Sequence, residues 1–316
     1  ENPDHGLLLD AMRTGIREFL YPPFERHVVR EALARVAQVL ARAAPPPAAA
    51  GAVFAFLPAK AGVGTSTIAL NVAAALAEQA GFRVLLGDFD LGSGLLDFML
   101  KLEPHHSVTH AAEHAADLDE SLWPQLVTSA GRMDLLASGR MNPGFRIEPA
   151  QVRYILDFAR RNYRAICLDL SGNMEKYSIE AMHEAKRVFL VCTSEVPALH
   201  LAREKLNLLR KMELEERVGI LLNRAQKRAV VSLEEIENLL GARVEFAFPN
   251  DYPGVHKALT AGTPVDPASE LGRRFRDMAR QLFPPKDSPP APKRRFVEYF
   301  SLLPARYSLL QPGKKH

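Results

Sequence analysis

The sequence predicts an α/β fold in which a mostly parallel sheet carries helices on both faces. Short apolar runs alternate with longer amphipathic runs through most of the 316 residues, and a glycine-bearing loop follows the first apolar run. Hydrophobic residues make up 47% of the chain and charged residues 24%, as in ordinary globular proteins. A chain of this length can bury a large core, and ligands of such sheets bind at the carboxyl ends of the strands.

The elements of this fold follow from the spacing of apolar residues. The expected strands are short apolar runs bounded by turn residues, namely Val53–Leu57, Val84–Gly87, Met133–Ala137, Ala165–Asp169, Val188–Cys192, Val218–Leu222 and Val244–Phe248. The expected helices have apolar residues at helical spacing, namely Ser66–Ala80, Pro149–Arg161, Ala198–Met212, Ser232–Leu240 and Pro267–Leu282.

Two segments flank this body. Residues 1–42 are expected to form a helix, a short strand and a helix, and the uncharged Ala/Pro stretch 43–51 is typical of a linker. Residues 284–316 contain seven Lys/Arg and two Asp/Glu, a net charge of +5. Since the whole chain carries +3, the remaining residues sum to 3 − 5 = −2, which disfavours a basic nucleic-acid platform.

Cysteine usage and hydropathy indicate a cytoplasmic location. Cys167 and Cys192 are the two cysteines, and both lie inside apolar runs, as expected in a reducing compartment. Apolar runs fall short of the ~18 residues that a membrane-spanning helix needs. The chain starts at Glu1 without a signal-peptide pattern, so we expect a fragment or a processed product.

A phosphate-binding loop is predicted between the first strand and the following helix. Gly62 and Gly64 leave room for a phosphate to approach the backbone, and a helix N-terminus directs amides toward it. Ser66, in the first turn, offers a hydroxyl to Mg²⁺. The alternative is a plain strand–helix turn with Ser66 or Thr67 as the N-cap. The predicted nucleotide-binding residues of the loop are Lys60, Ala61, Gly62, Val63, Gly64, Thr65, Ser66 and Thr67.

Carboxylates follow two of the predicted strands. Asp88 and Asp90 come at the end of the second strand, and Asp169 ends a later one. Because parallel strands end at the same edge, these side chains are expected beside the phosphate loop. Carboxylate and hydroxyl oxygens suit Mg²⁺, so Ser66, Asp88 and Asp169 are the predicted metal residues.

These motifs resemble the ParA/MinD family of P-loop NTPases, the SIMIBI class. The stretch Lys60-Ala-Gly-Val-Gly-Thr-Ser-Thr is similar to its deviant Walker A motif, and Asp88-Phe-Asp90 to its switch I. Asp169 matches its Walker B position. The resemblance covers about residues 51–283 and implies an ATPase domain over residues 52–283 that binds ATP or ADP with Mg²⁺. It also implies an adenine-binding role for Asn223, Arg224 and Pro249.

Within that family, three stretches resemble the CpaE/TadZ branch. They are Ser107-Val-Thr-His-Ala, Leu118-Asp-Glu-Ser-Leu and Met133-Asp-Leu-Leu-Ala. Residues 1–42 are similar to the C-terminal part of the atypical receiver-like domain that precedes the ATPase in that branch. This resemblance implies a switch that localises or assembles type IV/Flp (Tad) pilus or secretion machinery, with assembly proteins as partners. Recruitment to the inner membrane face or a cell pole stays open.

The family resemblance also implies a mechanism. Lys60 matches the signature lysine that reaches the partner's nucleotide in an ATP-bound homodimer, and Asp90 matches the residue that orients the attacking water. Both are the predicted catalytic residues. Thr65 departs from the family, which has a second lysine there, so slow hydrolysis and a non-hydrolysing nucleotide-bound scaffold stay open. A DNA-partitioning ParA-type ATPase is the less favoured alternative.

The tail contains one further pattern. A basic triplet, 293–295, precedes Phe296, Phe300 and Leu303, which lie on one face of a short helix. Basic residues beside an aromatic face suit an anionic membrane surface. A solvated tail and a partner-docking segment are the alternatives.

Overall fold

The computed structural model describes residue 29 and residues 51–79, 83–142, 144–226 and 231–284. The chain divides between Ala50 and Gly51 into two compact units. Expectations for residues 1–42, for 43–50 of the linker and for the tail beyond Pro284 lie outside the described residues. The fold described below is that of the second unit.

One eight-stranded sheet forms the centre of the described fold. Its strands lie in the order β3-β4-β2-β5-β1-β6-β7-β8, and every neighbouring pair is parallel except β3 and β4. The predicted, mostly parallel sheet is therefore confirmed. The strands are β1 (Ala52–Pro58), β2 (Val84–Phe89), β3 (Thr128–Ala130), β4 (Met133–Leu136), β5 (Ala165–Leu170), β6 (Arg187–Cys192), β7 (Val218–Ala225) and β8 (Val244–Pro249).

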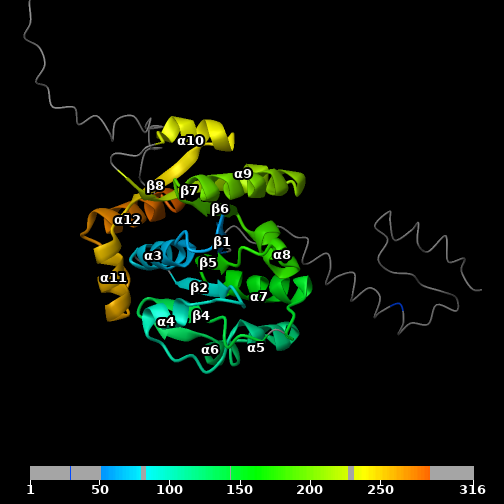
Figure 1. The fold of residues 1–316 in the computed structure, drawn as a ribbon. Helices are drawn as coiled ribbons and strands as arrows, with labels where there is room; N and C mark the ends of the chain where they lie inside the picture. The colour runs from blue at the N-terminus through cyan, green and yellow to red at the C-terminus, as the bar shows by residue number, and fades with distance from the viewer. Residues whose placement is uncertain (1–28, 30–50, 80–82, 143, 227–230, 285–316) are drawn as a thin grey trace, which may run out of the picture. The chain divides into compact units, whose positions relative to one another are not determined.

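Helices cover both faces of this sheet (Figure 1). On one face lie α3 (Thr65–Ala77), α4 (Leu96–Leu100), α11 (Tyr252–Ala261) and α12 (Glu270–Leu282). On the other lie α5 (Val108–Glu113), α6 (Trp123–Leu126), α7 (Pro149–Asn162), α8 (Lys176–Glu184), α9 (Val196–Lys211) and α10 (Leu233–Leu240). Short 3₁₀ turns occupy Ala115–Asp117 and Glu215–Arg217.

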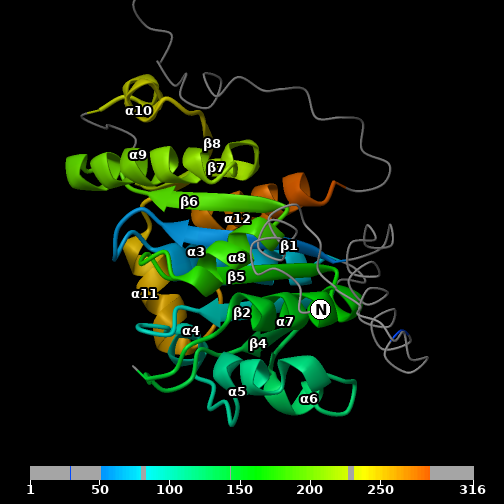
Figure 2. The ribbon, with the colours of Figure 1, turned by 90° about the vertical axis from the view of Figure 1, so that its right-hand side faces the viewer.

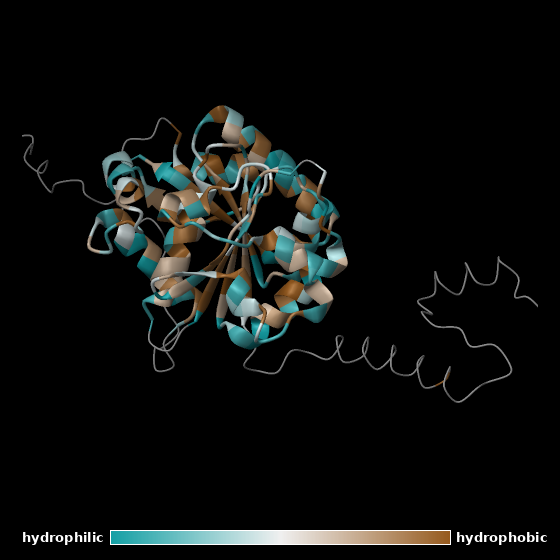
Figure 3. Ribbon diagram, turned by 90° about the horizontal axis from the view of Figure 1, so that it is seen from below, coloured by the Kyte–Doolittle hydropathy of each residue, from teal (hydrophilic) through white to brown (hydrophobic). Residues whose placement is uncertain are grey.

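Each face of the sheet has its own hydrophobic core. Every residue of β2 and of β5 is buried, as expected for central strands covered by helices on both sides. Figure 3 shows the hydrophobic strands enclosed between helices that carry most of the hydrophilic residues. β2 and β5 are otherwise free of charged residues, so the buried carboxylate in each of them, Asp88 and Asp169, is a feature that packing does not explain.

Helix boundaries differ from the prediction where capping decides them. α12 begins at Glu270 and not at Pro267, because the Ser269 hydroxyl accepts a hydrogen bond from the Gly272 amide at 2.9 Å and caps the helix. α3 begins one residue earlier than predicted, at Thr65, and ends at Ala77. The short helices α4, α5, α6, α8 and α11 and the strand β3 were not predicted.

The strand ends place the predicted site at one edge of the sheet. Figure 2 shows the strands lengthwise, with their carboxyl ends at the left. The loop from β1 into α3 lies at this edge, together with the segments that follow β2, β5 and β7.

Candidate functional site

The loop between β1 and α3 has a backbone that requires glycine at two positions. Gly62 has φ 82° and Gly64 has φ 89°, both in the left-handed region. A Cβ built at Gly62 would meet nothing within 4 Å, so the loop is open to solvent there. Side chains therefore do not shut this part of the loop, and a ligand can approach its backbone.

Helix α3 presents an uncompensated N-terminus to the same place. Gly64 is the N-cap of α3. All residues of this helix are described, and among them no side chain caps the N-terminus and no acidic residue lies in the first turn. The first intrahelical bond runs from Ile68 N to Gly64 O at 3.1 Å, so the amides of Thr65, Ser66 and Thr67 precede it. The alternative in which Ser66 or Thr67 is the N-cap is wrong. Free amides and the positive end of the helix dipole together favour an anion.

Thr65 carries a buried hydroxyl group that the described residues leave without a hydrogen bond. The residue is 6% exposed, and its hydroxyl is buried without a hydrogen-bond partner among the described residues. A buried hydroxyl left unpaired is costly, so such a group usually has a partner that the protein alone does not provide. A phosphate oxygen at the loop would be an acceptor of the required kind.

Asn223, at the end of β7, holds the loop between β1 and α3. Its side-chain Nδ2 donates to the Val63 carbonyl at 2.7 Å, and its Oδ1 accepts from the Arg224 amide at 2.9 Å. A Cβ at Gly64 would lie 2.4 Å from Asn223 Nδ2, so glycine is required there for space as well as for φ. Asn223 therefore supports the backbone of the loop directly, through its hydrogen bond to Val63.

The other predicted adenine-side residues lie close to Asn223. Arg224 is exposed with φ 53°, at an irregularity in the pairing of β7 with β8. Pro249 ends β8 and is paired in register with Ala225, so the two strand ends meet. The structure thus brings both segments to the carboxyl edge, and their contact with a base stays a prediction.

Asp88 and Asp169 form a buried carboxylate pair beside the loop. They are register partners on the adjacent strands β2 and β5, with exposures of 0% and 2%. Burial, more than any neighbouring charge, raises the pKa of Asp88 to about 7. Burial and then the Asp88 charge raise the pKa of Asp169, whereas a hydrogen bond with the Ser66 side chain lowers it. Two apposed carboxyls in an apolar sheet favour the arrival of a cation.

Asp90 directly follows β2, and its carboxylate accepts hydrogen bonds within the turn that it begins. Its Oδ1 accepts from Gly92 N at 3.2 Å and from Ser93 N at 3.0 Å, and its Oδ2 accepts from Ser93 Oγ at 2.8 Å. A carboxylate has about four lone-pair sites, so room is left for one further donor such as a water molecule.

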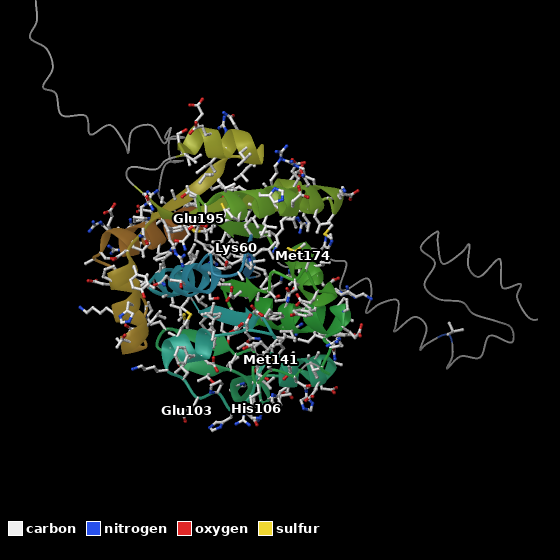
Figure 4. The ribbon with its side chains drawn as sticks, in the orientation of Figure 1. Lys60, Glu103, His106, Met141, Met174 and Glu195 are labelled. Carbon is white, nitrogen blue, oxygen red and sulfur yellow. The ribbon has the colours of Figure 1, made fainter. Side chains whose placement is uncertain are left out.

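Lys60 lies exposed at the start of the loop. Figure 4 faces the carboxyl ends of the strands and shows Lys60 at this edge, between Glu195, which follows β6, and Met174, which follows β5. An exposed lysine in this position is free to meet a ligand or a second molecule that approaches the edge. Ala61 is likewise exposed, whereas Val63 is buried and anchors the loop.

The residues present fit a magnesium ion held together with phosphates. Ser66, Asp88 and Asp169 offer oxygen atoms, and the hydroxyl of Ser66 already bonds to Asp169. Among the described residues, no group of three or more His, Cys, Asp or Glu side chains is arranged to hold a metal alone. Mg²⁺ characteristically takes one or two carboxylates and completes its shell with water and substrate phosphates.

Two residues of this edge were not predicted. The Tyr177 hydroxyl donates to the Phe89 carbonyl at 3.2 Å, directly before Asp90, and Lys205 Nζ donates to the Pro58 carbonyl at 2.7 Å, directly before the loop. A tyrosine or lysine within an amphipathic helix carries no local signal for such distant contacts.

The sequence matches a nucleotide-binding domain family and proteins that belong to it. Residues 54–247, more than half of the chain, match the family of the CobQ/CobB/MinD/ParA nucleotide binding domain. The septum site-determining protein MinD of Thermotoga maritima is 25% identical over 242 residues, which cover 73% of this chain and 88% of that protein.

Solved structures of other proteins superimpose on this chain. A ParA family ATPase from Chlorobium tepidum superimposes with a TM-score of 0.67 at 27% identity, covering 73% of this chain and 99% of that one. The MinD protein of Pyrococcus horikoshii complexed with Mg-ADP superimposes with a TM-score of 0.62 at 20% identity, covering 74% and 96%, which supports the fold.

Proposed function

The chain belongs to the CobQ/CobB/MinD/ParA nucleotide-binding family, and from that premise we propose that it is an ATP-binding and ATP-hydrolysing dimeric switch. One observation carries the proposal. The open glycine loop leads into an uncapped helix beside the buried Asp88–Asp169 pair, and the buried Thr65 hydroxyl lacks a partner among the described residues. A triphosphate with its metal supplies the anion, the acceptor and the cation that this arrangement lacks.

The residues of the loop divide the binding work. The amides of Gly62–Thr67 hold the phosphates, and the Thr65 hydroxyl donates to one phosphate oxygen. Ser66, Asp88 and Asp169 would hold Mg²⁺, which would neutralise phosphate charge when bound. Asn223, Arg224 and Pro249 form the adenine side. The Mg-ADP complex of the P. horikoshii MinD relative supports the choice of nucleotide and metal.

Two residues carry the proposed chemistry. Asp90 accepts a hydrogen bond from the attacking water at its remaining lone-pair site and orients it. Lys60, exposed at the loop, reaches the phosphates bound by the partner of a homodimer. A cation that arrives from a partner in this way can contribute roughly 10³–10⁵ in rate. Because Lys60 depends on the partner, hydrolysis is coupled to dimer formation and then releases the dimer.

The cellular role that we propose is that of the CpaE/TadZ branch. The stretches 107–111, 118–122 and 133–137 resemble that branch, so the switch would localise or assemble type IV/Flp (Tad) pilus or secretion machinery. We place it in the cytoplasm, with recruitment to the inner membrane face or a cell pole through assembly proteins or the basic tail. No helix among the described residues has the length and apolar character that crossing a bilayer requires.

A non-hydrolysing scaffold is the second candidate. Thr65 removes a lysine charge from the phosphate site, and three local hydrogen bonds already occupy the Asp90 carboxylate. Both features disfavour turnover, while the loop amides and the helix dipole still allow nucleotide to bind, although more weakly than with the lysine. A DNA-partitioning role is less favoured, because the chain without its tail carries a net negative charge.

Phosphate release decides between these functions. We expect purified protein with Mg-ATP to release phosphate, and Asp90→Ala to stop the release without loss of ATP binding. Binding with no release above buffer supports the scaffold. ATP-dependent, salt-sensitive retention on DNA would instead favour the partitioning role.

For the tail, sedimentation with anionic liposomes that disappears on deletion of residues 293–316 supports membrane contact.

A further inference from the structure

Lys205 joins two loops at the carboxyl edge of the sheet. The residue lies in α9, and its Nζ donates to the Pro58 carbonyl and to the Gly172 carbonyl, both at 2.7 Å. Pro58 ends β1 and leads into the phosphate-binding loop, whereas Gly172 follows β5. β1 and β5 are adjacent strands, so one cation from a third element holds both strand ends.

Forming this contact costs free energy, because the Lys205 side chain loses both solvent and conformational freedom. Lys205 is half-buried, and burial lowers the pKa of its ammonium, partly opposed by the charge of Glu175. Ordering a lysine side chain costs up to about 2 kcal/mol of entropy. Two charge-assisted hydrogen bonds offset this cost. A Cβ at Gly172 would lie 3.2 Å from Nζ, so the absence of a side chain there permits the close approach.

The segment held by Lys205 also reaches the end of β2, directly before Asp90. Ser171 Oγ donates to Glu175 at 3.2 Å, within the turn after β5. At the far end of the segment, the Tyr177 hydroxyl donates to the Phe89 carbonyl at 3.2 Å. Segment 171–177 is therefore joined through Lys205 to Pro58, at the base of the β1–α3 loop, and it contacts Phe89, the residue before Asp90, at its other end.

We propose that Lys205 is a positioning residue that ties the phosphate-binding loop to segment 171–177 and, through Tyr177, to the backbone of Asp90. The proposal rests on the proposed function. Lys205 places a cation next to a loop that has Thr65 in place of a lysine. Lys205 does not touch the phosphates in this arrangement. It fixes the relative position of the two backbones between which ATP and the attacking water are held.

The first test needs no nucleotide. Lys205→Met removes the ammonium group and keeps an unbranched side chain that is one atom shorter. Lys211→Met, at an exposed site in the last turn of the same helix, is the matched control. In nucleotide-free protein we expect amide exchange in segment 171–177 to accelerate about tenfold or more in Lys205→Met, because hydrogen bonds to a charged group are lost. The control should exchange as the wild type does. Unchanged protection in Lys205→Met would overturn the tie.

The second test separates positioning from simple stability. At saturating Mg-ATP, Lys205→Met should lower kcat about tenfold, while KM changes less than about threefold and the melting temperature stays close to that of the control. An unchanged kcat contradicts the positioning role. If the wild type binds ATP without turnover, the dissociation rate of a fluorescent ATP analogue takes the place of kcat. If the wild type binds no ATP, the proposed function fails, and amide exchange alone still decides the tie.

Restoring the charge chemically completes the experiment. In Lys205→Cys, the thiolate displaces bromide from 2-bromoethylamine, which rebuilds an ammonium side chain through a thioether. Iodoacetamide yields a neutral adduct as the control. Cys167 and Cys192 are buried and burial raises the pKa of both thiols, so they react slowly. Recovery of exchange protection and kcat with the ammonium adduct alone supports the proposal, and equal behaviour of the two adducts would overturn it.

Discussion

The side chain of Asn223 donates a hydrogen bond from Nδ2 to the backbone carbonyl of Val63 at 2.7 Å, joining the end of β7 to the β1–α3 loop, the proposed phosphate-binding site. The same atom occupies the space that a Cβ of Gly64 would need. The segment expected to recognise adenine is therefore also a support of the loop. A substitution at this position separates the two roles.

Asn223→Ala should weaken all polyphosphates alike. Loss of one neutral hydrogen bond that supports the loop costs about 0.5–1.5 kcal/mol, or roughly 2–13-fold in affinity. ATP, GTP and inorganic triphosphate should lose affinity by similar factors in calorimetric titrations. Asn162→Ala is the control, because its Nδ2 also donates to a backbone carbonyl, that of Phe158, but at the end of α7. A loss confined to ATP would instead assign Asn223 to the base.

Gly64→Ala should abolish nucleotide binding while leaving a folded protein. Alanine at φ 89° costs about 1–2 kcal/mol, and its Cβ would also displace Asn223 Nδ2. Gly131→Ala is the matched control, because Gly131 has φ 68° and open space around its Cβ position, in the turn between β3 and β4. Urea denaturation should show both variants folded, with the larger stability loss in Gly64→Ala because the Asn223 contact is displaced as well, and ATP binding should disappear only in Gly64→Ala. Retained binding in Gly64→Ala contradicts the loop assignment.

Nucleotide-free protein should lose stability as pH rises toward 7. The pKa of Asp88 is raised from 3.8 to about 7, so between these values the folded state binds a proton that the unfolded state has released. The free energy of unfolding then falls with pH, by up to about 1.4 kcal/mol per pH unit for one such group. Urea denaturation at about pH 5 and about pH 7 measures the slope.

Two comparisons check the origin of that slope. Asp88→Asn should make it shallower, leaving the part due to Asp169, whose pKa is raised as well. Mg-ATP should also flatten it, because a bound metal stabilises the ionised carboxylates. A slope identical in wild type and Asp88→Asn would show that Asp88 does not titrate in this window.

Lys60→Ala should separate nucleotide binding from dimer formation. Lys60 is exposed at the edge of the sheet, so its removal leaves the loop backbone intact. We expect ATP affinity to stay within about threefold of the wild type, since the amides and the helix dipole still bind the phosphates. Light scattering should show a monomer in Mg-ATP. An ATP-dependent dimer as abundant as that of the wild type would remove Lys60 from the interface.

The sheet and its carboxylates could be predicted because each rests on local pattern. Apolar runs of strand length, the strand–glycine–helix sequence around Gly64, and the positions of Asp88 and Asp169 at strand ends are all readable along the chain. Parallel strands end at one edge, so their proximity followed from the fold class. The structure adds that the two carboxylates are register partners.

Contacts between distant segments could not be predicted in this way. Asn223 and Val63 are 160 positions apart, and Lys205 and Pro58 are 147 apart, so no periodicity relates them. The helices α4, α5 and α6, with 5, 6 and 4 residues, are too short to show helical spacing. Packing against the sheet, which a linear pattern does not encode, stabilises them.

The most direct measurement is an equilibrium titration of nucleotide-free protein with ATP, with and without Mg²⁺, while molecular mass and released phosphate are followed. The account predicts saturable binding of one ATP per chain that Mg²⁺ strengthens, followed by conversion of monomer to dimer with ATP but not with ADP. Folded protein that binds no ATP at any Mg²⁺ concentration would contradict the assignment of the β1–α3 loop as a phosphate-binding site.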